Sequence, residues 1–193
     1  RTPYDFHLIA GSPDVEYMAR LNTLTYTGII DSFNELNGAW DYLIIDTAPG
    51  VTAAVLSFLQ SVHEIILVVC DEPSSLTSTY ALMKIMKNRY QWQRFHVLAN
   101  MVRDVREGRA LFNKLYYITE QFLDVQLNYL GLVPFNEDAH EAIKKQKVLM
   151  NASPECNVAK ALQQVASTVE EWPVQLAIGG HTSFFAERYM TSE

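Results

Sequence analysis

The sequence predicts an α/β fold in three layers, with a parallel sheet covered by helices on both faces. Five short apolar segments predict strands, and they lie at residues 5–10, 42–46, 64–70, 94–100 and 128–133. Longer stretches with apolar residues at helical spacing separate them, so strands and helices alternate. Strands that are apolar throughout are buried on both faces, and alternating helices form the crossovers of a parallel sheet.

The predicted elements follow one another in a regular order. The segment "DFHLIA" comes first, and helical spacing at residues 29–36 leads to "YLIID". Helical spacing at residues 51–62 then leads to "EIILVVC", and the strands "RFHVLAN" and "NYLGLV" follow after further helices. Two more helices are predicted at about 137–148 and 155–171. Each unit of strand and helix supports the same parallel arrangement.

The length of the chain fits one globular domain with its own core, since 193 residues lie within the usual domain size. We expect this domain to cover residues 1–173. Pro173 and the pair Gly179–Gly180 interrupt the pattern after the last helix. Residues 174–193 are therefore expected to form a C-terminal tail. An amphipathic helix that touches the membrane is one interpretation of its aromatic ending. The other, favoured because the ending has no basic face, is that Phe184 and Phe185 dock back on the domain or on a partner.

Charge and composition exclude several classes of protein. The net charge of −7 argues against direct binding of nucleic acid, which needs clustered lysine and arginine. The two cysteines form no CxxC pair, so a reduced, cytoplasmic setting fits best. No apolar run approaches the roughly 18 residues of a membrane span. The chain opens on Arg1 rather than Met, which suggests a fragment or a processed product.

Polar residues follow four of the predicted strands. They are Asp46 with the turn to Gly50, the segment Asp71–Ser75, the pair Asn100–Met101, and Pro134–Asn136. The carboxyl ends of parallel strands form one edge of the sheet, where ligands bind in α/β folds. A carboxylate there can hold hydrated Mg²⁺, and a glycine lets the backbone approach a phosphate closely. The pattern predicts a nucleotide site at this edge.

Simpler interpretations of the same residues stay open. Asp46 would also serve as the cap of a helix that starts near Gly50. Asn100 would serve as an ordinary turn residue, and Pro134 as a strand terminator. His63, His96 and His140 are isolated from one another and from cysteine in the sequence, so structural roles are expected for them.

Long stretches of the chain resemble the MinD/ParA group of deviant Walker A ATPases. The resemblance runs through "DYLIIDTAPG", "EIILVVCDEPSSLTSTYALMKIM", "FHVLANMVRDVREGRALFNKL" and "FLDVQLNYLGLVPFNEDAHEAIKKQK". Within this group, "VVCDEP", "LANM" and the ending "EEWPV" with "GHTSFFAERYM" are closest to the branch that regulates flagellar number. The resemblance implies a P-loop NTPase fold and a Mg²⁺-dependent ATPase that binds ATP and ADP and works as a dimer.

The resemblance also implies a role for each strand-end residue. Asp46 would be the carboxylate that holds magnesium through water, and Gly50 the switch glycine beside the γ-phosphate. The adenine base would be bound by Asn100, Met101 and the loop of Pro134, Phe135 and Asn136. The dimer face would carry Glu72, Ser75 and Ser78, although MinD has an aspartate at about the position of Ser78.

One departure from the family pattern affects activity. The sequence contains no Gly-Lys pair, so the phosphate-binding loop with its lysine is absent. The chain thus resembles the later part of the family domain, an N-terminally truncated sheet is expected, and the chain alone is predicted not to hydrolyse ATP.

The resemblance further implies partners and a location. The partners are a second copy of the protein, an FlhF-like GTPase, a flagellar transcription activator and flagellar switch-complex proteins. The location is the cytoplasm, with a peripheral place at the inner face of the cell membrane near the pole, reached through the C-terminal tail.

Other functions compete with this interpretation. A Ser/His/Asp hydrolase is disfavoured because no G-x-S-x-G elbow follows any predicted strand. Another positioning ATPase of the MinD/ParA type, or a non-catalytic module that binds partners, fits the same residues. The affinity of the isolated chain for nucleotide, compared with that of a longer chain, separates these functions.

Overall fold

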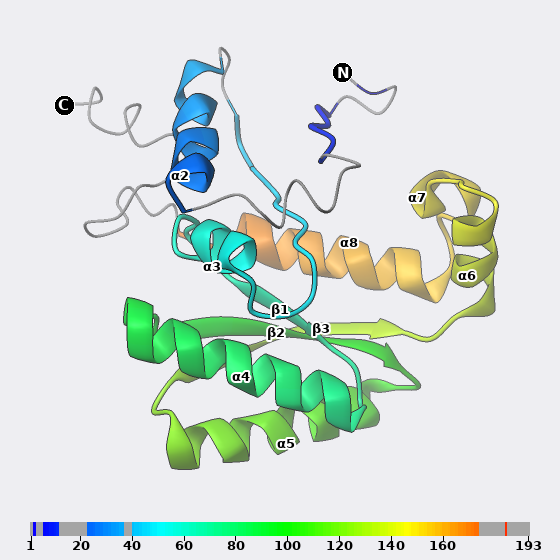
Figure 1. The fold of residues 1–193 in the computed structure, drawn as a ribbon. Helices are drawn as coiled ribbons and strands as arrows, with labels where there is room; N and C mark the ends of the chain where they lie inside the picture. Colours follow the sequence, from blue (N-terminus) through cyan, green and yellow to red (C-terminus); the bar gives the residue numbers. More distant parts are fainter. Residues whose placement is uncertain (1, 3–5, 12–22, 37–39, 174–183, 185–193) are drawn as a thin grey trace. The chain divides into compact units, whose positions relative to one another are not determined.

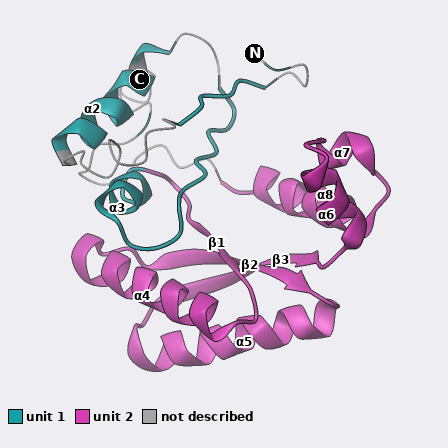
Figure 2. Ribbon diagram, turned by 45° about the vertical axis from the view of Figure 1, so that its right-hand side comes forward, with its two compact units in different colours: residues 1–61, 180–193 teal, residues 62–179 magenta. Residues whose placement is uncertain are grey.

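The computed structural model describes residue 2 and residues 6–11, 23–36, 40–173 and 184. The chain divides into two compact units, shown in separate colours in Figure 2. The first unit comprises residues 1–61 and 180–193, and the second comprises residues 62–179.

The regular structure described in the first unit is helical. It contains α2 (Thr23–Ser32), a short 3-10 helix η1 (Phe33–Glu35) and α3 (Ala53–Leu59). Its core holds Tyr26, whose ring meets that of the half-buried Phe58 edge to face with centroids 5.8 Å apart. Phe184 joins this core, since its ring lies 4.9 Å from that of Phe33 and 6.3 Å from that of Phe58.

The second unit is a three-layer α/β structure (Figure 1). Its strands are β1 (Ile66–Val69), β2 (Arg94–Val102) and β3 (Gln126–Pro134), which pair in parallel in the order β1-β2-β3. The helices α4 (Pro73–Tyr90) and α5 (Val105–Phe122) cover one face, and α8 (Asn157–Glu170) covers the other. The short helices α6 (Glu137–Lys144) and α7 (Leu149–Ala152) connect β3 to α8. The predicted fold class is thus confirmed.

The core of the second unit follows from the alternation of side chains along β2. Phe95, Val97 and Ala99 are fully buried on one face of the strand. His96 and Leu98 point to the opposite face, where the ring of His96 stacks on Trp172 just after α8. Apolar residues on both faces of a strand are what a sheet between two helix layers requires.

Turn chemistry sets the ends of the two long helices. α4 begins with Pro73, which lacks the N–H that a first turn leaves unpaired. It ends at Gln91, which adopts a left-handed conformation and donates its N–H to the Lys87 carbonyl at 3.1 Å. α5 begins after Asp104, whose Oδ1 accepts from the Glu107 N–H at 2.8 Å.

Two of the five predicted strands are wrong. Residues 6–10 and 42–46 are in neither helix nor strand, and Ile44 is 90% exposed. Their apolar composition favours a strand, but a strand also needs a neighbour to accept and donate its backbone hydrogen bonds. Among the described residues, neither segment has such a neighbour. Residue 5 lies outside the described residues.

β1 is one of the two edge strands of the described sheet. Its Ile66 and Val68 are exposed apolar residues on the face opposite the buried Leu67 and Val69. The expectation of a truncated sheet stays a prediction. The boundary at residue 173 stays a prediction, and the tail beyond it lies outside the described residues except for Phe184.

Candidate functional site

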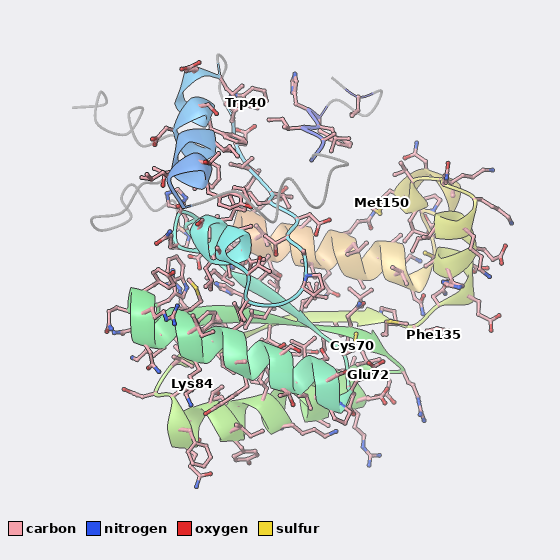
Figure 3. All side chains as sticks on the ribbon, viewed as in Figure 1. Trp40, Cys70, Glu72, Lys84, Phe135 and Met150 are labelled. Atoms are coloured by element: carbon pink, nitrogen blue, oxygen red, sulfur yellow. The ribbon has the colours of Figure 1, made fainter. Side chains whose placement is uncertain are left out.

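Three of the four predicted strand-end groups meet at one edge of the second unit. Because β1, β2 and β3 are parallel, their carboxyl ends lie together, with Val69 beside Ala99 and Asn100 beside Val133. Figure 3 shows Cys70, Glu72 and Phe135 at this edge. The sequence therefore located the edge correctly, while the roles of its residues stay predictions.

The end of β2 is irregular just after Asn100, which is still paired with Val133 on β3. The strand register shifts between Asn100 and Val102, and Met101 has a φ of 57°. A left-handed conformation is unfavourable for methionine by about 1–2 kcal/mol, and such strain gathers at functional sites. The extra residue re-aims the neighbouring side chains. Asn100 is half-buried, and Met101 is 58% exposed at the edge.

The end of β3 is fixed by three hydrogen bonds. The Phe135 N–H donates to the Val102 carbonyl at 2.9 Å, which continues the pairing with β2. Asn136 Oδ1 accepts from the Ala139 N–H at 2.9 Å, and Asn136 Nδ2 donates to Asn157 Oδ1 at 2.8 Å. Both ends of the Asn136 amide thus have partners within the protein. The Phe135 side chain, 55% exposed, is the group that the loop presents.

The end of β1 turns directly into α4. The Cys70 N–H donates to Ser75 Oγ at 3.1 Å, and Ser78 Oγ donates to the Ser74 carbonyl at 2.7 Å. The hydroxyl of Ser75 therefore shapes the turn, whereas Glu72 and Ser78 are exposed. The pKa of the Cys70 thiol is raised by burial and by the Glu72 carboxylate, while a hydrogen bond with Asn100 opposes this rise.

An ion pair that the sequence did not reveal joins this turn to α5. Lys114 Nζ lies 2.7 Å and 2.8 Å from the two carboxylate oxygens of Asp71. The two residues are 43 positions apart, so no local pattern signals the contact. Lys114 is half-exposed, as expected for a surface residue, and it also anchors the loop after β1.

Asp46 and Gly50 belong to the first unit. Asp46 is exposed and lies outside any helix or strand, and Gly50 has a φ of 105°. α3 is capped by Thr52, whose side chain accepts from the Val55 N–H at 3.4 Å. The interpretation of Asp46 as the helix cap is therefore wrong, because another residue caps the helix. The positive φ explains why the turn carries a glycine.

The predicted structural role of His96 is supported at the opposite end of the strands. His96 Nε2 lies 2.9 Å from Glu64 Oε2, and Arg94 donates to the other carboxylate oxygen at 2.5 Å. With Trp172, these side chains line a shallow hollow of about 280 Å³. Within the described ranges, no three His, Cys, Asp or Glu residues gather to hold a metal ion.

The described edge fits the base of a nucleotide better than its phosphates. It offers a half-buried amide at Asn100 and exposed apolar side chains at Met101 and Phe135, which suit a planar heterocycle. A phosphate site needs a nest of backbone N–H groups and lysine, and the sequence lacks the motif that supplies them. Magnesium has one predicted ligand, Asp46, acting through water.

Comparisons with known proteins agree with this fold. The ParA family model, described as "NUBPL iron-transfer P-loop NTPase", matches residues 26–170. The antiactivator FleN of Pseudomonas aeruginosa is 38% identical over 186 residues, which cover 96% of this chain and 66% of FleN. The flagellum site-determining protein YlxH of Helicobacter pylori is 27% identical over 164 residues, which cover 81% of this chain and 55% of YlxH.

The chain spans about two thirds or less of the length of these relatives. Among solved structures, the septum site-determining protein MinD of Pyrococcus horikoshii, in complex with Mg-ADP, has a similar fold with a TM-score of 0.60. The match covers 83% of this chain and 62% of that MinD chain at 21% identity. Because the family model covers most of the sequence and the parallel sheet agrees with it, the chain belongs to the ParA family of P-loop NTPases.

Proposed function

We propose that this chain is the later part of a FleN-type (FlhG-type) regulator of flagellar number and placement, which binds ATP with Mg²⁺ and dimerises when nucleotide is bound. The observation that carries the proposal is the 38% identity to the antiactivator FleN across almost the whole chain. The second relative, YlxH, is a flagellum site-determining protein. The carboxyl edge of β2 and β3 supplies the chemistry for the base.

Asn100 reads the edge of adenine in this proposal. Its amide carries both a donor and an acceptor, which match the amino group and ring nitrogen of adenine. Phe135 and Met101 flank the ring with exposed apolar surface. Pro134 and Asn136 fix the course of the loop, since the Asn136 amide already has two partners.

Asp46 and Gly50 serve the phosphate end. Asp46 holds the water shell of magnesium, and Gly50 gives the switch loop the conformational freedom to respond to the γ-phosphate. The phosphate-binding loop comes from a segment that this sequence lacks. The isolated chain is therefore expected to be inactive, and turnover belongs to the full-length protein that contains it.

The dimer face lies at the start of α4. Glu72 and Ser78 are exposed there, while Ser75 holds the turn behind them. A second copy of the protein packs against this face with nucleotide between the subunits. The dimer is the state that partners recognise, and ATP hydrolysis returns it to monomers.

The test of the proposed ATPase uses Asp46→Ala in the full-length protein. Turnover of ATP is expected to vanish while the circular dichroism spectrum stays unchanged, because the carboxylate acts in the site and not in the fold. Asp41→Ala is the matched control, since Asp41 is exposed in the same segment. Normal turnover in the Asp46 variant would remove this residue from the site.

Partner proteins bind the α4–α5 surface in this proposal. Lys84 is exposed on α4, and α5 exposes Tyr117 and Phe122 at 69% and 65%. Exposed aromatic side chains are frequent anchors of protein interfaces. The expected partners are an FlhF-like GTPase, a flagellar transcription activator and flagellar switch-complex proteins.

Charge reversal tests this surface in pull-down experiments with those partners. Lys84→Glu is the cleanest variant. Arg109 lies over the Tyr129 ring at 4.0 Å and Lys114 pairs with Asp71, so reversal of either also disturbs the fold. Partner binding that is indifferent to Lys84→Glu, Arg109→Glu and Lys114→Glu would move the surface elsewhere.

Two other functions remain candidates. One is another positioning ATPase of the MinD/ParA type, and the other is a non-catalytic module that binds partners without nucleotide. Nucleotide affinity separates them, because the module would bind its partner equally well with and without ATP. A positioning ATPase of another kind would bind ATP but none of the flagellar partners.

A further inference from the structure

The loop after β3 is hydrogen-bonded to the start of α8 by a residue to which no role has been assigned. Asn157 is the first residue of α8, and its Oδ1 accepts from Asn136 Nδ2 at 2.8 Å. The two asparagines are 21 positions apart and belong to different elements. α8 packs on β3, and its first turn buries Val158 and Ala159.

The contact completes a set of three constraints on Asn136 and Phe135. The Phe135 N–H is bound to Val102 on β2, and Asn136 Oδ1 is bound to the Ala139 N–H at the start of α6. The bond to Asn157 adds an anchor on α8. An exposed hydrogen bond between flexible side chains stabilises little, but here Asn136 is already ordered by its other bond, so less entropy is lost.

The position of Asn157 is fixed by the backbone at the start of α8. Cys156 caps the helix, with its Sγ accepting from the Ala159 N–H at 3.3 Å. Asn157 follows in the first turn, and its side chain is exposed toward solvent and toward Asn136. The backbone at this point is fixed both by the cap and by the burial of the next two residues.

We propose that Asn157 is a positioning residue that sets the course of the Pro134–Asn136 loop and thereby sharpens its fit to the nucleotide base. The inference rests on the proposed function of this edge. Asn157 does not touch the base. Loss of its bond leaves the loop held only by the Phe135 bond to Val102 and the Asn136 bond to Ala139, so the wall beside the base becomes less ordered.

The experiment compares Asn157→Ala with Asn157→Asp in the full-length protein. Aspartate keeps an oxygen that accepts from Asn136 Nδ2, whereas alanine has no acceptor. Asn157→Ala is expected to weaken binding of ADP roughly three- to tenfold and to reduce the preference for ADP over GDP. Hydrogen exchange at Phe135 and Ala139 should become faster in the same variant, and Asn157→Asp should restore both properties.

Controls separate failure of this inference from failure of the proposed function. Asn151→Ala removes an exposed amide on α7 and should change neither property. If the wild-type protein prefers ADP and Asn100→Ala loses that preference while Asn157→Ala keeps it, the inference is overturned and the proposed function stands. If the wild-type protein binds no nucleotide, the proposed function fails and the inference fails with it.

Discussion

At the scale of single residues, the strand ends combine features that were visible in the sequence with features that were not. Asn100 lies near the end of β2, and Glu72 and Phe135 follow the ends of β1 and β3, so their place at one edge follows from the parallel sheet. The anchor of Asp71 on Lys114 joins residues that are far apart in sequence. No pattern in a single sequence reveals such a pair, because it depends on how α5 packs on the sheet beside α4.

His96 makes stability depend on pH. Burial lowers its pKa, the Glu64 carboxylate opposes this, and Arg94 adds to the lowering. The unfolded chain takes up the proton more readily, so acid favours unfolding. The stability that neutral His96 confers is complete above about pH 6.5 and is lost as the pH falls through the lower pKa of the folded state.

Urea unfolding at pH 7.5 and 5.5 measures this effect. The wild-type chain should lose more of its unfolding free energy on acidification than His96→Gln does. The variant is needed because the pKa of His63 is also lowered by burial and contributes in the same direction. An equal loss in both proteins would show that His96 does not titrate in this range.

At the scale of elements, the sequence predicted strands well where both faces are covered. β2 and β3 are each within three residues of the predicted limits, and they lie between helices on both sides. The segments 6–10 and 42–46 have the same apolar character but no strand neighbour among the described residues. Composition signals the preference for a strand, while pairing decides whether one forms.

The close approach of α5 to β3 depends on Gly108. A Cβ at this position would lie 2.9 Å from Tyr129 Oη and 3.3 Å from Leu132 Cβ. Gly108→Ala is expected to lower stability by about 1 kcal/mol, because overpacking costs about 1–3 kcal/mol and exceeds the gain in helix propensity of about 1 kcal/mol. Thermal unfolding measures the change.

A second substitution tests the cause of this loss. Within the described part of the chain, Tyr129 Oη is buried without a hydrogen-bond partner. Tyr129→Phe removes this atom, which is also the nearest contact of the new methyl group. The double variant Gly108→Ala with Tyr129→Phe should therefore regain most of the lost stability. Ala110→Gly, at an exposed position of α5, measures helix propensity alone. If the stability changes of Gly108→Ala and Tyr129→Phe simply add in the double variant, the contact with Tyr129 Oη is not the cause of the loss.

At the scale of the whole molecule, the tail raises the question of membrane contact. Among the described residues, no helix is long and apolar enough to cross a bilayer. Phe184, one of the aromatics in the predicted amphipathic ending, is only 3% exposed and donates its N–H to the Ser61 carbonyl at 3.4 Å. The expectation that this phenylalanine docks back on the protein is met. Phe185, Arg188 and Tyr189 lie outside the described residues.

Co-sedimentation with liposomes of anionic lipid tests the tail in the full-length protein. We expect the same small bound fraction with and without residues 181–193 in the presence of ATP. A basic segment gains about 1 kcal/mol per lysine or arginine near such a surface, but the last ten residues hold Arg188 against Glu187 and Glu193. Phe184→Ala is the control for docking, and its unfolding free energy should fall by about 3 kcal/mol because a buried ring is removed. If the protein instead binds liposomes in an ATP-dependent way and loses this binding when residues 181–193 are removed, the dimer releases Phe184 and uses its two tails together.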